Sequence, residues 1–159
     1  MIGPGAPPRR VCALLALGFT AGCDHQLGVL DGTNLGEPQA AVFHHNPDSR
    51  LMVVLSDLPG LCDDLHTNEP PDVGDWWVLS LWTGSSANVD GDYPATGFTA
   101  LTRGGQVTEL QATAAELSVR DLSETQLDGR VDLSFDTGDR LGVRFTAELC
   151  EVPLFQGMD

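Results

Sequence analysis

The chain of 159 residues contains no lysine, and its eight basic side chains are all arginines. Phosphate-binding P-loops, Schiff-base enzymes and acyl-transfer enzymes with a Ser-x-x-Lys motif all depend on lysine, so these classes are excluded. The Gly-x-Ser-x-Gly nucleophile motif is also absent, and Thr83-Gly84-Ser85-Ser86 is typical of a loop. The sequence therefore predicts a protein that is not an enzyme and needs no cofactor.

Long apolar runs are missing as well, since none reaches the roughly 20 residues that a membrane-spanning helix needs. A shorter run, residues 11–19, follows Arg9-Arg10 and precedes the small residues Thr20, Ala21 and Gly22. A positive end, a short apolar core and small residues together form a secretory signal. We therefore expect residues 1–22 to be a signal peptide and the rest of the chain to be exported.

The segment Thr20-Ala21-Gly22-Cys23 resembles the lipobox of bacterial lipoproteins. The resemblance implies cleavage before Cys23, a diacylglyceryl thioether on its sulfur, and an acyl chain such as palmitate on its new amino group. Two or three acyl chains would anchor the protein in a lipid bilayer on the non-cytoplasmic side. Asp24 resembles an inner-membrane retention signal, but inner and outer membrane both stay open. A plainly secreted protein and an uncleaved anchor are the alternatives.

The mature chain is strongly acidic, because residues 23–159 carry six arginines and all 23 acidic residues, a formal charge of −17. Such a surface repels phosphate backbones, so we expect no nucleic-acid partner.

The cysteines then predict one cross-link. Cys12 would leave with the leader and Cys23 would be acylated, so Cys62 and Cys150 remain. Two thiols left in an oxidising compartment predict a disulfide. It would close a loop of about 90 residues and stabilise the fold by roughly 4–5 kcal/mol on the chain-entropy model.

Residues 23–38 hold three glycines and a proline without a clear period, so we expect the lipidated cysteine to be followed by a flexible linker. Residues 39–155 are the predicted β domain, and 156–159 are a C-terminal tail. Within this domain the alternation of apolar and polar residues predicts strands. These strands are expected at 39–44, 51–55, 76–82, 93–101, 117–119, 131–135 and 141–149.

The predicted fold class is all-β: a single-domain antiparallel β-sandwich of about seven or eight strands, with a small closed β-barrel as the alternative. Residues 58–65 predict one helical turn, and residues 107–118 fit either a helix or a strand. The segment Phe145 to Cys150 (Phe-x-Ala-x-x-Cys) resembles a late strand of small bacterial envelope lipoproteins of unknown function.

All three tryptophans fall within seven residues of one predicted strand. One face of that strand would carry Trp77, and the opposite face would carry Trp76 and Trp82. If the Trp77 face is core, the other face is either buried too or presents two tryptophans to a glycan or an apolar ligand. Trp76 and Trp82 would lie roughly 20 Å apart, so only an extended glycan would contact both.

A metal site is a weaker hypothesis. Its candidate ligands are His44, His45, Asp63, Asp64 and His66. Neighbouring residues on a strand point to opposite faces, so exposed polar side chains are favoured over a metal site. We expect a membrane-anchored envelope lipoprotein whose β domain binds or scaffolds an envelope protein or a glycan. The alternatives are a barrel that binds a small ligand or glycan through Trp76–Trp82, and a metal-binding periplasmic protein.

Overall fold

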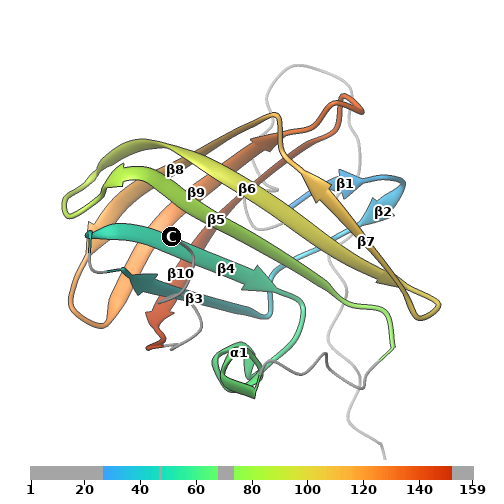
Figure 1. Ribbon diagram of the computed structural model, residues 1–159, viewed down its shortest axis with the longest axis horizontal. Coiled ribbons are helices and arrows are strands. Elements are labelled where there is room, and N and C mark those ends of the chain that lie inside the picture. Colours follow the sequence, from blue (N-terminus) through green and yellow to red (C-terminus); the bar gives the residue numbers. More distant parts are fainter. Residues whose placement is uncertain (1–26, 47, 68–73, 152–159) are drawn as a thin grey trace, which may run out of the picture.

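The computed structural model describes residues 27–46, 48–67 and 74–151 (Figure 1). The predicted signal peptide, Cys23 and the predicted tail at 156–159 lie outside the described residues. The described elements are β1 (Val29–Leu30), β2 (Thr33–Asn34), β3 (Ala40–His45), β4 (Arg50–Ser56), α1 (Leu61–Thr67), β5 (Trp77–Ser86), β6 (Gly91–Arg103), β7 (Gln106–Gln111), β8 (Ala114–Leu122), β9 (Gln126–Ser134) and β10 (Arg140–Leu149).

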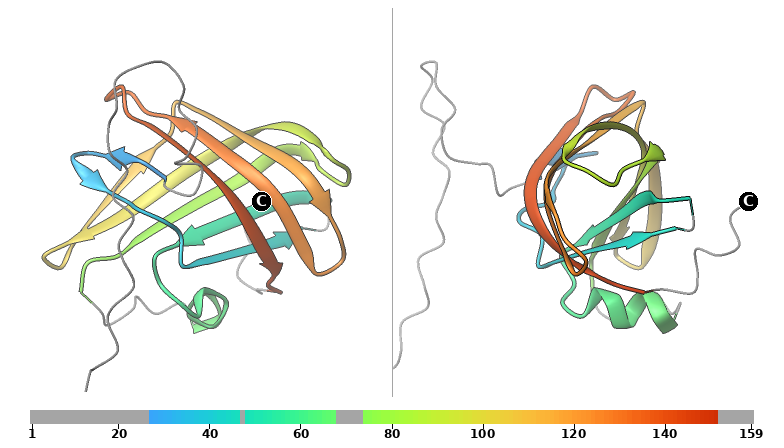
Figure 2. Two further views of the ribbon diagram at one scale, coloured as in Figure 1. Left: turned by 180° about the vertical axis from the view of Figure 1, so that it is seen from behind. Right: turned by 90° about the vertical axis from the view of Figure 1, so that its left-hand side faces the viewer.

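Seven strands close into a barrel in the order β5-β4-β3-β10-β9-β8-β6, and β6 pairs again with β5 (Figure 2). The all-β prediction is confirmed, and the architecture is the closed barrel that stood as the alternative to a sandwich. Most neighbouring strands are antiparallel. The exception is β3, which lies parallel to β10 through the pairs Glu148–Val42 and Leu149–Phe43.

The segment that fitted either a helix or a strand forms β7 and most of β8, which meet at a bend. The Ala112 N–H donates to the Gly97 carbonyl on β6, and the Thr113 N–H donates to the Ser134 carbonyl on β9. The chain thus changes pairing partner within two residues. As a result β8 belongs to the barrel, whereas β7 continues the sheet beside the last part of β6.

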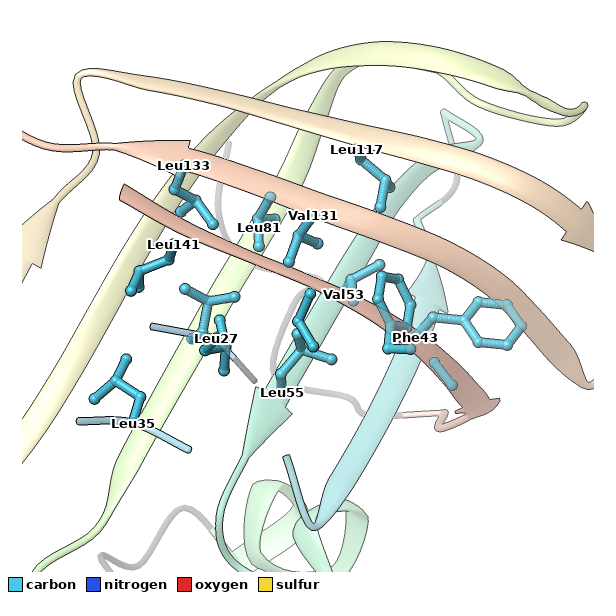
Figure 3. Packing of buried hydrophobic residues seen from close by; sticks show 14 of the residues in the cluster. Leu27, Leu35, Phe43, Val53, Leu55, Leu81, Leu117, Val131, Leu133 and Leu141 are labelled. Carbon is cyan, nitrogen blue, oxygen red and sulfur yellow. The ribbon is translucent and has the colours of Figure 1, made fainter. Parts of the chain in front are cut away.

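Side chains fill the interior of the barrel (Figure 3). The predicted inward face of residues 141–149 is confirmed, because Leu141, Val143, Phe145 and Ala147 are all buried. The packing is tight at Gly97, where an added Cβ would come within 2.6 Å of Leu133 Cδ2. Since side chains occupy the interior, open space for a ligand has to lie on the outer surface.

The predicted flexible linker is wrong for residues 27–38. Strands β1 and β2 form a short hairpin, and Leu27, Leu30 and Leu35 are at most 4 % exposed. The Trp77 indole N–H donates to the Leu35 carbonyl at 2.7 Å, and the Gly142 N–H donates to the Leu27 carbonyl at 3.0 Å. The folded domain therefore begins by residue 27, twelve residues earlier than the sequence pattern indicates.

Helix α1 covers part of the outer surface beside β3 (Figure 2). Leu61 packs there with Val42, Val54 and Cys150 in a second, smaller apolar cluster. The predicted disulfide joins Cys62 on the helix to Cys150 at the end of β10, with 5.7 Å between the two Cα atoms. The helix is thereby fixed to the outer face of the barrel.

Candidate functional site

The tryptophan-bearing strand β5 has two different faces. Trp77, Leu79 and Leu81 point into the barrel and are at most 4 % exposed. The alternate residues Trp76, Val78, Ser80 and Trp82 are half-buried. The division of β5 into a core face and an outer face is therefore as predicted, and the outer face is accessible in part.

A groove of about 740 Å³ runs over this outer face. It crosses three neighbouring strands, with Met52 from β4, Val78 and Ser80 from β5, and Phe98 and Ala100 from β6. The lining is mainly apolar, and its volume lies within the range usual for small-ligand sites. Because the interior is filled, this groove is the place where the described barrel can receive a ligand against an apolar surface.

Two stacked aromatic rings line the groove. The ring centroids of Trp82 and Phe98 are 5.3 Å apart, and the ring planes differ by 18°. The two residues lie on adjacent strands because Trp82 pairs with Thr96 and Phe98 pairs with Ser80. Stacking restricts both side chains, so the aromatic surface is held in place before a ligand arrives.

Polar groups surround this surface. His44 comes from β3, Asn46 from the turn that follows it, Arg50 from the start of β4 and Glu109 from β7. The His44 Nδ1 lies 3.2 Å from the Cys150 carbonyl oxygen, which can only accept, so Nδ1 carries the proton in this contact. The groove thus combines an apolar floor with hydrogen-bonding groups at its edge.

Trp76 is not among the residues that line the groove. Trp76 lies immediately before β5, at the end of the strand far from Trp82, and its carbonyl accepts the N–H of Thr102 on β6. Of the two predicted tryptophans, only Trp82 contributes to the site. Phe98, its stacking partner, was missed. Apolar residues fall on both faces of residues 93–101, so alternation alone does not show which way Phe98 points. Its place beside Trp82 depends on the register between β5 and β6.

The candidate metal ligands do not gather into one site. His44 and His45 are consecutive residues of β3, whereas Asp63, Asp64 and His66 lie on α1. Within the described ranges, the only group of three possible ligands is Cys62, His66 and Cys150. The two sulfurs of that group are joined in the disulfide, so they are not available as thiolate ligands.

Burial shifts the pKa values of His45 and Asp57, whereas hydrogen bonds from the Asp31 N–H and the Thr137 hydroxyl lower the pKa of the exposed Asp139. Burial lowers the pKa of His45 below its ordinary value of 6.5, and the nearby charge of His44 lowers it further. Burial raises the pKa of Asp57, although its carboxylate accepts the Trp77 N–H at 2.9 Å. None of the three residues lines the groove that contains Trp82 and Phe98.

Comparison with known proteins finds no family model, no curated protein and no solved structure that matches this chain. None of the helices in the described part of the chain is long and apolar enough to cross a membrane.

Proposed function

We propose that this chain is a cell-envelope lipoprotein whose barrel binds a carbohydrate chain in the groove at Trp82 and Phe98. The stacked pair of aromatic rings in a groove with a polar edge carries the proposal. A sugar ring has an apolar C–H face and a rim of hydroxyl groups, so it matches an apolar floor edged by His44, Arg50 and Glu109. We propose that the groove only binds the carbohydrate and catalyses no reaction on it.

The shape of the groove favours an oligosaccharide over a single sugar. From Val78 to Trp82 the outer face of β5 extends over four residues, roughly 13 Å. The lining also continues sideways across β4 and β6. A chain of several sugar units would use the full length, with one ring against the aromatic pair and its neighbours over Val78 and Ala100.

Tryptophan fluorescence tests this proposal. Titration with an N-acetylglucosamine oligosaccharide and with a cello-oligosaccharide should give a saturable change in emission. We expect Trp82→Ala and Phe98→Ala to weaken binding at least about tenfold, as removal of a central aromatic contact does. Trp76→Phe is the matched control and should leave the dissociation constant within about twofold. Affinity that Trp82→Ala does not change, or no saturable signal with either sugar, would exclude the groove as a carbohydrate site.

The proposed anchor is Cys23. Cys23→Ser should release the protein from the membrane fraction of cells, because its acyl chains supply the membrane affinity. Cys12→Ser is the control, since Cys12 lies in the predicted leader and should not affect partitioning. Mass spectrometry of the mature wild-type protein should show the added acyl chains. Unchanged membrane partitioning of Cys23→Ser, or a mature N-terminus without added mass, would overturn the anchor.

A scaffolding role is the second candidate, and one observation favours it. Strand β7 lies at the end of the eight-stranded order and pairs only with β6 among the described strands. Val107 on this strand is 56 % exposed. A free strand edge can pair with an extended segment of another protein. A photocrosslinking residue at position 107 should then capture an envelope protein in intact cells, and capture of none would count against this role.

A further inference from the structure

The barrel closes through very few pairs between β3 and β10. Strand β10 pairs with β9 all along Arg140–Glu148, but it pairs with β3 only at Glu148 and Leu149. Before these two positions, residues 37–41 and residues 144–146 line opposite sides of a groove of about 650 Å³. We call this opening between the two segments the seam.

The backbone of Thr146 faces the seam. Along a strand, the N–H and C=O groups of alternate residues point to opposite neighbours. The Cys150 N–H donates to the Phe43 carbonyl on β3, and β10 keeps an unbroken register, so Thr146 points the same way as Cys150. Pairing with β3 starts only at Glu148, so Thr146 has no strand partner on this side in the described part of the chain. An extended segment can pair at such an edge.

Two grooves provide the space along the seam. The groove of about 650 Å³ extends over the outer surface of β8 and β9, and a second groove of about 320 Å³ continues toward the start of α1. They share residues 39–41 and Thr146. Volumes of this size are usual for binding sites. Neither groove shares a lining residue with the one at Trp82 and Phe98, so the seam is a separate surface.

Acidic side chains outnumber basic ones along the seam. Asp132 accepts two hydrogen bonds from Arg130, both at 2.8 Å. Asp92 lies 3.4 Å from Arg120. Arg144 is the third arginine in the lining, and the lining acids are Glu37, Asp63, Asp128 and Glu148. Six carboxylates and three guanidinium groups leave a formal excess of three negative charges, in a mature chain of −17. A basic partner would therefore be attracted to this surface.

We propose that the seam binds an extended, basic segment of another protein as an added β-strand. The segment would continue the sheet where β3 turns away from β10, and it would exchange backbone hydrogen bonds with Thr146. Its lysine or arginine side chains would pair with the exposed acids Glu37 and Glu148. Backbone pairing supplies affinity in this mode of recognition, and the acids supply the preference for a basic sequence.

The test titrates peptides into the mature protein and follows amide hydrogen exchange by NMR. The probe is a hexapeptide of alternating lysine and valine with blocked ends. It should slow exchange of the Thr146 amide at least about tenfold. We expect it to bind at least about tenfold more tightly than the same peptide with glutamate in place of lysine. A lysine peptide with methylated backbone nitrogens keeps its charge but cannot donate to the ladder, so it should bind at least about tenfold more weakly.

Two pairs of variants place the peptide on the seam. Thr146→Pro removes the N–H that faces the seam and leaves the bonds to β9, so it should weaken binding about tenfold, whereas Thr146→Ala should not. If Thr146→Pro fails to fold, the methylated peptide tests the same hydrogen bonds. Glu148→Gln should weaken binding about threefold. Asp90→Asn removes the same charge from an exposed turn outside the seam and should leave affinity unchanged.

Each contrary result overturns one part of the proposal. Equal affinity for the methylated and unmethylated peptides would exclude strand pairing, and equal affinity for the lysine and glutamate peptides would exclude a basic partner. Binding of neither peptide would exclude the seam as a docking site. Slow exchange of Thr146 in the free protein would mean that the seam is already filled, by residues before Leu27 or by a second copy, and would also refute the proposal.

Discussion

The hydroxyl oxygen of Thr83 accepts the backbone N–H of Leu51 at 3.0 Å, and the same hydroxyl donates to the Ser85 carbonyl at 2.7 Å. Thr83 is fully buried on β5. Thr99, on the neighbouring strand β6, is equally buried, but its hydroxyl has no hydrogen-bond partner among the described residues. Two threonines with the same burial therefore differ in whether their hydroxyl groups are satisfied.

This difference predicts opposite effects of the same substitution. Thr99→Val keeps the branched shape and removes an unsatisfied hydroxyl, so we expect the free energy of unfolding to rise by about 1 kcal/mol. Thr83→Val leaves the Leu51 N–H without its acceptor and should lower the free energy of unfolding by about 1–3 kcal/mol. Urea unfolding measures both. If Thr99→Val were as destabilising as Thr83→Val, the Thr99 hydroxyl would have to be satisfied in the folded protein.

The hairpin of β1 and β2 predicts that residues before the expected domain boundary contribute to stability. Leu30 is fully buried, so Leu30→Ala should lower the free energy of unfolding by about 2–5 kcal/mol. Val29 is 50 % exposed, and Val29→Ala should change it by less than about 0.5 kcal/mol. Thermal or urea unfolding of the two variants compares them directly. Equal, small effects would return residues 27–38 to the role of a linker.

The sequence predicts the strands well because apolar residues alternate with polar ones where one strand face is buried. Residues 131–134 of β9 and 141–149 of β10 show this clearly. The closure of the barrel depends instead on pairings between segments far apart in the chain, such as β3 with β10. Alternation within one strand does not encode that pairing, so a sandwich and a barrel were equally compatible with the pattern.

The same limit explains what was missed in the groove at Trp82 and Phe98. The sequence indicates Trp82 because three tryptophans gather on one strand, whereas Phe98 becomes its neighbour only through the register of β6. The hairpin at residues 27–38 was missed for a local reason. Its strands are two residues long and are separated by a turn that contains Gly32, so no alternation develops.

The lowered pKa of His45 predicts a stability that depends on pH. Between its folded-state pKa and 6.5, the unfolded chain binds a proton that the folded chain does not, so stability rises with pH. Acidification from about pH 7.5 should therefore destabilise the protein, and the loss should level off below the folded-state pKa. His45→Gln removes this contribution and should give a flatter profile. Because Asp57 is present in both proteins, the difference between the two urea-unfolding profiles isolates His45.

NMR titration of the imidazole provides the direct check on His45. Its midpoint should lie below 6.5, and His44→Gln should raise it in part, because the His44 charge is the second cause of the shift. A midpoint at or above 6.5 would contradict the predicted direction and with it the expected pH profile.

The disulfide between Cys62 and Cys150 predicts a large change in stability. The cysteines are separated by 88 positions in sequence, so cross-linking them restricts most of the unfolded chain. The double variant Cys62→Ala/Cys150→Ala should lose about 4–5 kcal/mol of unfolding free energy on the chain-entropy model. A loss below about 1 kcal/mol would contradict that model for this fold. The denatured mature wild-type protein should show no free thiol, whereas Cys62→Ala alone should show one, from Cys150. Two thiols in the wild-type protein would exclude the disulfide itself.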